Sequence, residues 1–189
     1  MAIYAPPCEY DEARSRIRDL DVIAWEGRGF ISRAISLVTL GTVTHVGIAL
    51  WWGDSLMVVE SREFRGGRAV RLREQIPAGG VLVYRAREPL PDASAALQCA
   101  IEGTGAGYSY VGCLRFLRRL GLPMRLPAED RGTRGARFCS EFVSLVYRMG
   151  GTDVRPDLLD AETAPADVVS SPHLTLLFRA LPPSKGATI

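Results

Sequence analysis

The feature that most constrains the fold is a run of strand-like segments in the first half of the chain, joined by short turns. Residues 45–52 and 55–62 are rich in β-branched and aromatic side chains and flank Gly53-Asp54, a pair typical of a two-residue hairpin turn. The alternating segment 68–73 and the apolar segment 80–87 continue the series. Short connections between successive strands favour antiparallel pairing, so we predict a meander.

Helical patterns dominate the second half. Apolar residues recur at helical spacing in 92–103, 108–120 and 138–149, and Gly150-Gly151 ends the last of these segments. The remaining predictions are a short polar helix at 8–19, a strand at 21–26, a helix at 27–40, a loop at 121–137, a turn at 165–170 and a late strand at 174–181. Strands followed by helices indicate an α+β fold, in which an antiparallel sheet packs against helices.

A chain of 189 residues suits one domain, and we assign 1–189 to a single domain. Its core is expected within about residues 18–175, with 1–17 and 182–189 at the periphery. The net charge of +2 gives no reason to expect a nucleic-acid partner. No apolar stretch approaches the ~20 residues of a membrane span, so no integral membrane segment is expected. The oligomeric state stays open.

The first residues lack the basic and apolar regions of a secretory signal. We therefore expect a protein that is cytoplasmic as synthesised, with non-classical delivery or phage-encoded release left open. Four cysteines and two histidines form no CxxC pair and no HExxH helix, so neither a metal nor another cofactor is expected. Three cysteines are interpreted as structural, and one histidine as a surface residue: Cys8, Cys99, Cys113 and His173.

The predicted hairpin places a histidine near a carboxylate. Counting outward from the turn pairs Trp52 with Ser55 and Gly47 with Glu60. Because side chains alternate with period two, His45 then shares a face with Glu60, diagonally and roughly 7–8 Å away between backbones. Gly47 leaves the space between them empty. Glu60 can therefore fix the imidazole tautomer and leave the second nitrogen as a base.

A second candidate lies in the helix predicted at 138–149. Cys139 stands in its first turn, in line with the apolar residues Phe142, Val143 and Val146. The positive end of a helix favours a thiolate, and its first N–H groups can stabilise an oxyanion. A free cysteine on an apolar helix face is also a common small core residue. Both interpretations remain open from these residues alone.

Four motifs occur in the order expected of a known family: Asp21-Val22-Ile23, Thr44-His45-Val46-Gly47-Ile48, Val58-Val59-Glu60-Ser61 and Phe138-Cys139-Ser140-Glu141-Phe142-Val143. Together they resemble the YiiX/YebB-like branch of the circularly permuted NlpC-type papain-like cysteine hydrolases, in which the histidine strand precedes the cysteine helix. The resemblance covers about residues 18–175. It differs from the family pattern at Ser109, often an aspartate, and at Leu20, usually a glycine.

The resemblance implies a permuted papain-like fold with the nucleophile at a helix N-terminus. It makes Cys139 the nucleophile, His45 the base and Glu60 the third member of the triad. Tyr108 and Ser140 are weaker candidates for contact with substrate or oxyanion. No metal ligand is implied.

The leading hypothesis is a cysteine hydrolase that cleaves an amide through a thioester acyl-enzyme. Its substrate would be a peptide or isopeptide, such as a cell-wall stem peptide. A lipid acyl hydrolase or acyltransferase on the same triad is the first alternative, and would need an apolar groove from Trp25, Phe30 and Trp51. A non-catalytic binding module that kept the fold is the second. The arginines that precede Cys139 in 118–137 either attract an anionic substrate or form a solvated loop.

Overall fold

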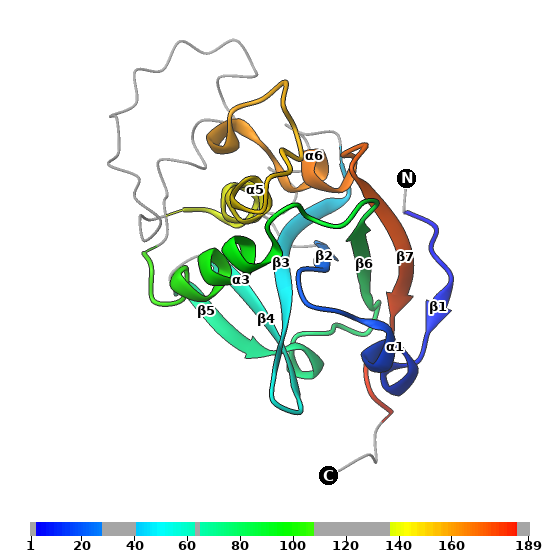
Figure 1. Ribbon diagram of the computed structural model, residues 1–189. Helices are drawn as coiled ribbons and strands as arrows, with labels where there is room; N and C mark the ends of the chain where they lie inside the picture. Colours follow the sequence, from blue (N-terminus) through cyan, green and yellow to red (C-terminus); the bar gives the residue numbers. More distant parts are fainter. Residues whose placement is uncertain (1–2, 28–40, 63–64, 108–136, 185–189) are drawn as a thin grey trace.

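The computed structural model describes residues 3–27, 41–62, 65–107 and 137–184, which form a mixed α+β fold on one seven-stranded sheet (Figure 1). The strands of these residues are β1 (Pro7–Cys8), β2 (Val22–Glu26), β3 (Val43–Trp52), β4 (Ser55–Arg62), β5 (Gly66–Arg71), β6 (Val81–Ala86) and β7 (Leu174–Ala180). The helices are α1 (Tyr10–Arg16), α3 (Ala93–Glu102), α5 (Cys139–Met149) and α6 (Pro165–Val169), with 3-10 turns η1 (Leu72–Glu74) and η3 (Asp160–Glu162).

The sheet has the strand order β1-β7-β6-β2-β3-β4-β5. The predicted hairpin is confirmed, because Trp52 pairs with Ser55 in the antiparallel β3–β4 ladder. The meander stops at β5, however, and β6 pairs with β2 on the other side of β3. The reason is the connection after β5, where η1 and a turn closed by the Gly80 N–H on the Pro77 carbonyl lead the chain away from the β5 edge.

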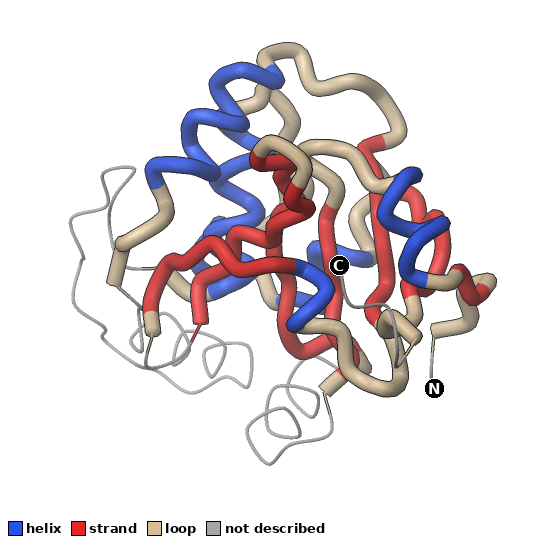
Figure 2. Tube along the Cα trace, turned by 90° about the horizontal axis from the view of Figure 1, so that it is seen from below, coloured by secondary structure: helices blue, strands red, loops and turns tan. Residues whose placement is uncertain are grey.

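Helices cover both faces of the sheet. One face packs on α3, α5 and α6, and its core includes Val46, Val59 and Val143. The other face packs on α1. Figure 2 shows helices on both sides of the strands. The sheet is therefore the middle layer, and α5 carries Cys139 on the face that holds Val46.

The N-terminal segment differs from its predicted peripheral place. Ala13 and Ile17 are buried, at 0% and 3% exposure, in the cluster under α1. β1 extends the sheet by pairing in parallel with β7. These residues complete the core because the second face of the sheet is apolar and needs a cover.

Most of the other predicted elements agree with the structure where it describes them. Two differ, since the strand predicted at 68–73 ends at Arg71 and continues as η1, and the turn predicted at 165–170 contains the helix α6. α3 begins after Asp92, whose side chain accepts a hydrogen bond from the Ala95 N–H at 2.9 Å and caps the helix. α5 begins at Cys139 and ends before Gly150. The helices predicted at 27–40 and 108–120 and almost all of the loop at 121–137 lie outside the described residues. Of the helices in the described ranges, none is long and apolar enough to cross a membrane.

Candidate active site

His45 lies on β3 beside an irregularity of the sheet. Trp25 pairs with His45, but the next residue, Glu26, pairs with Val43, so Thr44 is the extra residue of a β-bulge. Bulges bend a strand and re-aim its side chains, which suits a functional histidine. The Trp25 ring lies 5.1 Å from the imidazole between centroids, and the His45 side chain is 17% exposed. One side of the imidazole is therefore covered, and the ring keeps a narrow opening to solvent.

Glu60 lies on the neighbouring strand β4 and holds His45. The distance from Glu60 Oε2 to His45 Nε2 is 2.5 Å, and the Glu60 side chain is fully buried. The carboxylate thus occupies one imidazole nitrogen and leaves Nδ1 for other chemistry. This is the geometry predicted from the hairpin register.

Gly47 has a second effect besides the predicted one of leaving room between His45 and Glu60. A Cβ at this position would lie 2.8 Å from Val58 Cγ2 and 2.9 Å from the Val59 carbonyl oxygen. The glycine therefore permits the close approach of β3 to β4, in addition to leaving room before Glu60, whose Cβ would be 3.3 Å away. The absence of a side chain at Gly47 fixes the strand spacing across which His45 and Glu60 meet.

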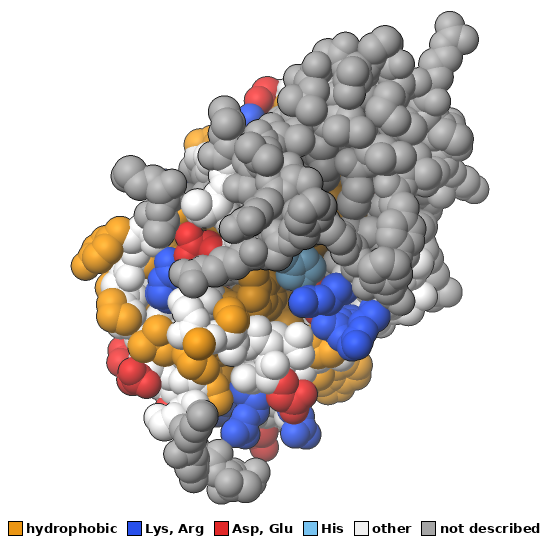
Figure 3. Space-filling view, turned by 180° about the vertical axis from the view of Figure 1, so that it is seen from behind, with side chains coloured by type: hydrophobic (Ala, Val, Ile, Leu, Met, Phe, Trp, Pro, Cys, Tyr) orange, Lys and Arg blue, Asp and Glu red, His pale blue; other side chains and the backbone are white. Residues whose placement is uncertain are grey.

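Arginines surround the rest of the Glu60 carboxylate. Two nitrogens of Arg68, Nε and Nη2, donate to Glu60 Oε1 at 2.8 and 2.5 Å. Arg62 Nη1 lies 3.5 Å from Oε2. The side chains of His45 and Arg62 are 17% and 46% exposed. Figure 3 shows one face of the molecule, on which basic side chains gather beside a histidine.

Cys139 is the first residue of α5 and is buried at 7% exposure. The preceding residue, Phe138, is extended and has no side-chain oxygen to cap the helix, while its carbonyl accepts the Phe142 N–H at 3.0 Å. The first N–H groups of α5 are therefore not capped by the Phe138 side chain. The thiol lies at the positive end of an eleven-residue helix.

The sheet and the helix bring the thiol to the imidazole. Burial alone would lower the pKa of His45, but the charge and hydrogen bonding of Cys139, together with those of Glu60, raise it to about 9. Because Glu60 holds Nε2, the imidazole nitrogen left for the thiol is Nδ1.

The pKa of Glu60 moves in the opposite direction. Burial alone would raise it, but the hydrogen bond and charge of His45, the hydrogen bonds of Arg68 and the charge of Arg62 lower it to about 2. The carboxylate is therefore ionised throughout the neutral range. The cluster brings a thiol, an imidazole and a carboxylate together in series.

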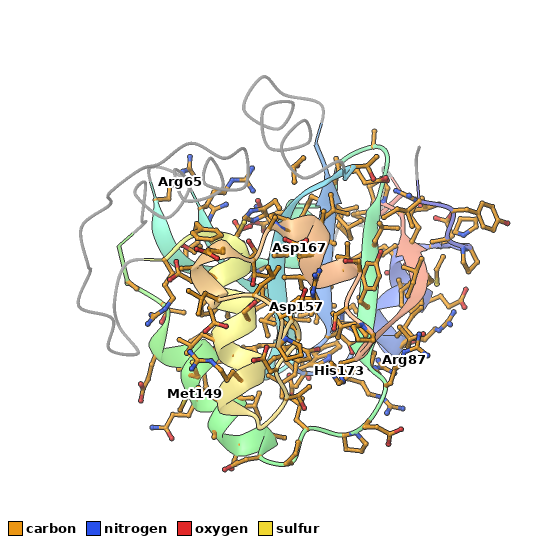
Figure 4. The ribbon with its side chains drawn as sticks, turned by 90° about the horizontal axis from the view of Figure 1, so that it is seen from above. Arg65, Arg87, Met149, Asp157, Asp167 and His173 are labelled. Atoms are coloured by element: carbon orange, nitrogen blue, oxygen red, sulfur yellow. The ribbon has the colours of Figure 1, made fainter. Side chains whose placement is uncertain are left out.

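The weaker candidates have other places. Ser140 is fully buried and its Oγ donates to the Thr163 carbonyl at 2.7 Å, so its side chain anchors α5 and leaves only the backbone N–H for an oxyanion. Tyr108 lies outside the described residues. Cys99 is buried, and burial raises the pKa of its thiol, consistent with a structural role. His173 lies beside Arg87 and far from Arg65 at the β4–β5 turn (Figure 4), and its carbonyl accepts the Arg87 N–H.

The sequence reasoning did not assign a role to Arg68. The signal was present, since Arg68 lies in an alternating strand that follows β4. Its pairing directly opposite Glu60 depends on the β4–β5 register, which the connecting residues do not reveal.

A separate cavity of about 350 Å³ runs along α5. Its lining includes Arg137, Glu141 and Arg148 and part of the segment 153–161, but neither Cys139 nor His45. Arg148 pairs across it with Asp160 at 2.5 Å. This cavity is therefore separate from the site formed by Cys139 and His45.

No protein-family model matches the sequence, and no curated protein matches it. Among solved structures, the chain is similar to the crystal structure of the metalloprotein YiiX from Escherichia coli O157:H7. The TM-score is 0.63 over 87% of this chain and 98% of the YiiX chain, with 19% sequence identity. This likeness establishes a YiiX-like fold, whereas the activity has to be argued from the side chains.

Proposed function

We propose that this protein is a cysteine hydrolase that cleaves an amide bond, with Cys139 as nucleophile, His45 as acid and base and Glu60 as the residue that orients His45. The observation that carries the proposal is the series in which Cys139 contacts the imidazole whose Nε2 is held by Glu60 at 2.5 Å. A nucleophile, a base and an orienting group in contact are the requirements of covalent acyl transfer. The permuted papain-like assignment is part of this proposal.

The reaction would begin with the Cys139 thiolate attacking the carbonyl carbon of the amide. The oxyanion that forms is stabilised by backbone N–H groups in the first turn of α5. His45 then gives its Nδ1 proton to the leaving amine as the C–N bond breaks, and a thioester remains. Water attacks the thioester, His45 takes the proton of that water, and the C–S bond breaks to release the acid and restore the thiolate.

The buried tryptophan supports a peptide or isopeptide amide over a lipid acyl group. Trp25 is 8% exposed and packs in the core. Trp51 lies near the other end of β3 from His45 and lines a small apolar cavity with Leu50 and Ile101, a cavity that contains neither Cys139 nor His45. These two tryptophans therefore do not form an apolar groove at the Cys139 site. Phe30 lies outside the described residues. A cell-wall stem peptide is the first substrate to test.

The first experiment follows the alkylation of Cys139 by iodoacetamide over a range of pH, using mass spectrometry. We expect Cys139 to react below neutral pH in the wild type, and His45→Ala to lose this reactivity because the thiolate loses its counter-ion. Cys99 in the same chain is an internal reference, since burial raises the pKa of that thiol. His173→Ala is the matched control and should leave the profile unchanged.

Hydrolysis of stem-peptide fragments, assayed in parallel with phospholipid vesicles, then tests the substrate. Loss of peptide cleavage in Cys139→Ala supports the proposal. If Cys139 reacts as slowly as Cys99 at every pH and does not respond to His45→Ala, the hydrolase is contradicted. A binding module that kept the fold would then replace it.

The name of the structural neighbour raises the question of a metal. Within the residues that the structure describes, no group of three or more His, Cys, Asp or Glu side chains is arranged to hold a metal ion. Cys139 and His45 offer two ligating atoms, while Glu60 is engaged by His45 and Arg68. These residues do not fit a metal centre, and no step above passes through a metal.

A further inference from the structure

We propose that Arg68 is a positioning residue of the active site, which holds the Glu60 carboxylate turned toward His45. The inference rests on the proposed function, because it concerns the same thiol and imidazole. It assigns a fourth member to the series, at the carboxylate oxygen that His45 does not use.

The position of Arg68 follows from the sheet. β5 pairs with β4 in a register that sets Arg68 directly opposite Glu60. Side chains directly opposite on adjacent antiparallel strands have Cβ atoms about 4.5–5.5 Å apart, so an arginine reaches a glutamate without a change of backbone. The Arg68 side chain is 18% exposed, so this contact is largely shielded from water.

The contact divides the two oxygens of Glu60. Arg68 donates two N–H groups to Oε1, and His45 takes Oε2. Charge-assisted hydrogen bonds of this kind are strong and directional. A glutamate side chain has three torsions, and a contact at Oε2 alone would leave the carboxylate free to turn about it. The second anchor at Oε1 removes that freedom and aims Oε2 at the imidazole.

Arg68 also compensates the burial of the charge. A fully buried carboxylate is costly unless it is paired and hydrogen-bonded. A neutral Glu60 would not support an imidazolium, so an arginine that keeps Glu60 ionised also favours the protonated form of His45 and the thiolate of Cys139.

The neighbouring residues hold Arg68 in place. Its Nη2 lies 3.4 Å from Gln75 Oε1, and the Gln75 carbonyl accepts the Trp25 indole N–H at 2.8 Å. Trp25 in turn covers the His45 ring. The residue after η1 therefore connects the arginine behind the carboxylate with the tryptophan beside the imidazole.

Arg62 provides a matched control on the same carboxylate. It lies 3.5 Å from Glu60 Oε2, and its side chain is 46% exposed. An exposed contact at this distance adds little to the orientation of a partner. Arg62→Gln and Arg68→Gln thus remove the same charge from the same neighbour and differ in geometry.

The experiment measures the pH profile of Cys139 alkylation by iodoacetamide in the full chain. For Arg68→Gln we expect the acid limb of the profile to move up by about one pH unit, whereas Arg62→Gln moves it by less than about 0.3. Arg68→Lys keeps the charge but loses the pair of N–H groups on Oε1. It should therefore move the limb in the same direction as Arg68→Gln.

The variants are repeated in a Glu60→Gln background. If Arg68 acts through Glu60, Arg68→Gln should cause no further shift there. Thermal unfolding and circular dichroism check the fold, and Arg68→Lys carries the test if Arg68→Gln does not fold.

Two results would overturn the inference: an Arg68→Lys profile that coincides with that of the wild type, or a full shift from Arg68→Gln in the Glu60→Gln background. Both leave the Cys139–His45 pair intact. The proposed function fails separately, when wild-type Cys139 does not respond to His45→Ala.

Discussion

Two buried carboxylates, Asp21 and Glu60, lie next to arginines in this sheet but are used in different ways. Asp21 is 1% exposed and gives one oxygen each to Arg85 Nε and Nη2, both at 2.7 Å. Its Oδ2 also accepts the Arg18 N–H at 2.8 Å. Glu60 gives only Oε1 to its closest arginine and keeps Oε2 for His45. We call Asp21 the closed carboxylate, because both of its oxygens are held by donors of Arg85 and Arg18. Glu60 is the open one, because one of its oxygens is held by His45, a side chain that can gain or lose a proton.

The pKa values of the two carboxyl groups shift in opposite directions. Burial raises the pKa of Asp21, in spite of the hydrogen bonds from Arg85 and Arg18. The pKa of Glu60 is lowered to about 2, in spite of its burial, because His45 and two arginines share the carboxylate. A buried acid–arginine pair is therefore not by itself a sign of catalysis, and the titratable neighbour distinguishes the two.

The largest effect on stability is expected at the closed carboxylate. Asp21→Asn replaces one of the two oxygens that accept hydrogen bonds from Arg85 and Arg18 by an NH2 group, which leaves a donor without its acceptor, and should lower the free energy of unfolding by about 3 kcal/mol. Urea denaturation measures this change. The matched control is Asp157→Asn, since Asp157 also meets both Nε and Nη2 of one arginine but has a side chain that is 61% exposed. That variant should cost less than about 1 kcal/mol.

The same Asp21→Asn protein should alkylate at Cys139 with an unchanged pH profile while it is folded, because Asp21 has no contact with the thiol. A profile that shifts as it does in a Glu60 variant would remove the distinction between the two carboxylates.

The next largest effect is expected on the reactivity of Cys139 when Glu60 is replaced. Glu60→Gln keeps an oxygen for Arg68 but removes the charge that stabilises the imidazolium. We expect the alkylation of Cys139 at acidic pH to fall by about tenfold, which corresponds to a shift of one pH unit. The mass-spectrometric profile measures this fall, and retained circular dichroism shows that the fold persists. Reactivity equal to that of the wild type would mean that Glu60 is only a structural residue.

The smallest effect is the pH dependence of stability. The folded pKa of His45, about 9, lies above its ordinary value of 6.5, so its contribution is complete below 6.5 and is lost as pH rises toward 9. The folded pKa of Glu60, about 2, lies below its ordinary 4.5, so its contribution is complete above 4.5 and is lost as pH falls toward 2. The pair therefore stabilises the fold most between these ordinary values.

The contribution of Asp21 to stability changes with pH in the opposite direction to that of Glu60. Its folded pKa is raised above 3.8, so its contribution is present below 3.8 and is lost as pH rises through the folded value. Thermal unfolding of the wild type, Glu60→Gln and Asp21→Asn over pH values from about 3 to about 10 separates the two sites. Glu60→Gln should flatten the acidic loss of stability, and Asp21→Asn should make it steeper. An unchanged acidic limb in Glu60→Gln would contradict the assignment.

Much of the candidate active site could be predicted because its parts are local. The two-residue turn at Gly53-Asp54 fixes the register of one hairpin, and this register places His45 on the face of Glu60. The start of α5 at Cys139 is visible in the spacing of its apolar residues. These features depend on a few consecutive residues, which carry their own backbone preferences.

The order of the strands could not be predicted in the same way. The sequence indicated a continuous meander, yet β6 leaves β5 and pairs with β2, and β1 joins β7. The segment of residues 1–17 was expected at the periphery, but residues 8–17 cover an apolar face of the sheet. Both choices depend on which distant apolar surfaces meet, and no local pattern encodes that.

The sequence by itself determined the helix that carries Cys139, the strand that carries His45 and the hairpin partner Glu60, since turn chemistry and side-chain periodicity act over a few residues. Only the tertiary structure decided that the thiol reaches the imidazole, that Arg68 takes the second oxygen of Glu60 and that Asp21 is closed by Arg85. These contacts join residues from different strands and helices. Their geometry is set by the packing of α5 on the sheet and by the strand order, which the whole core fixes cooperatively.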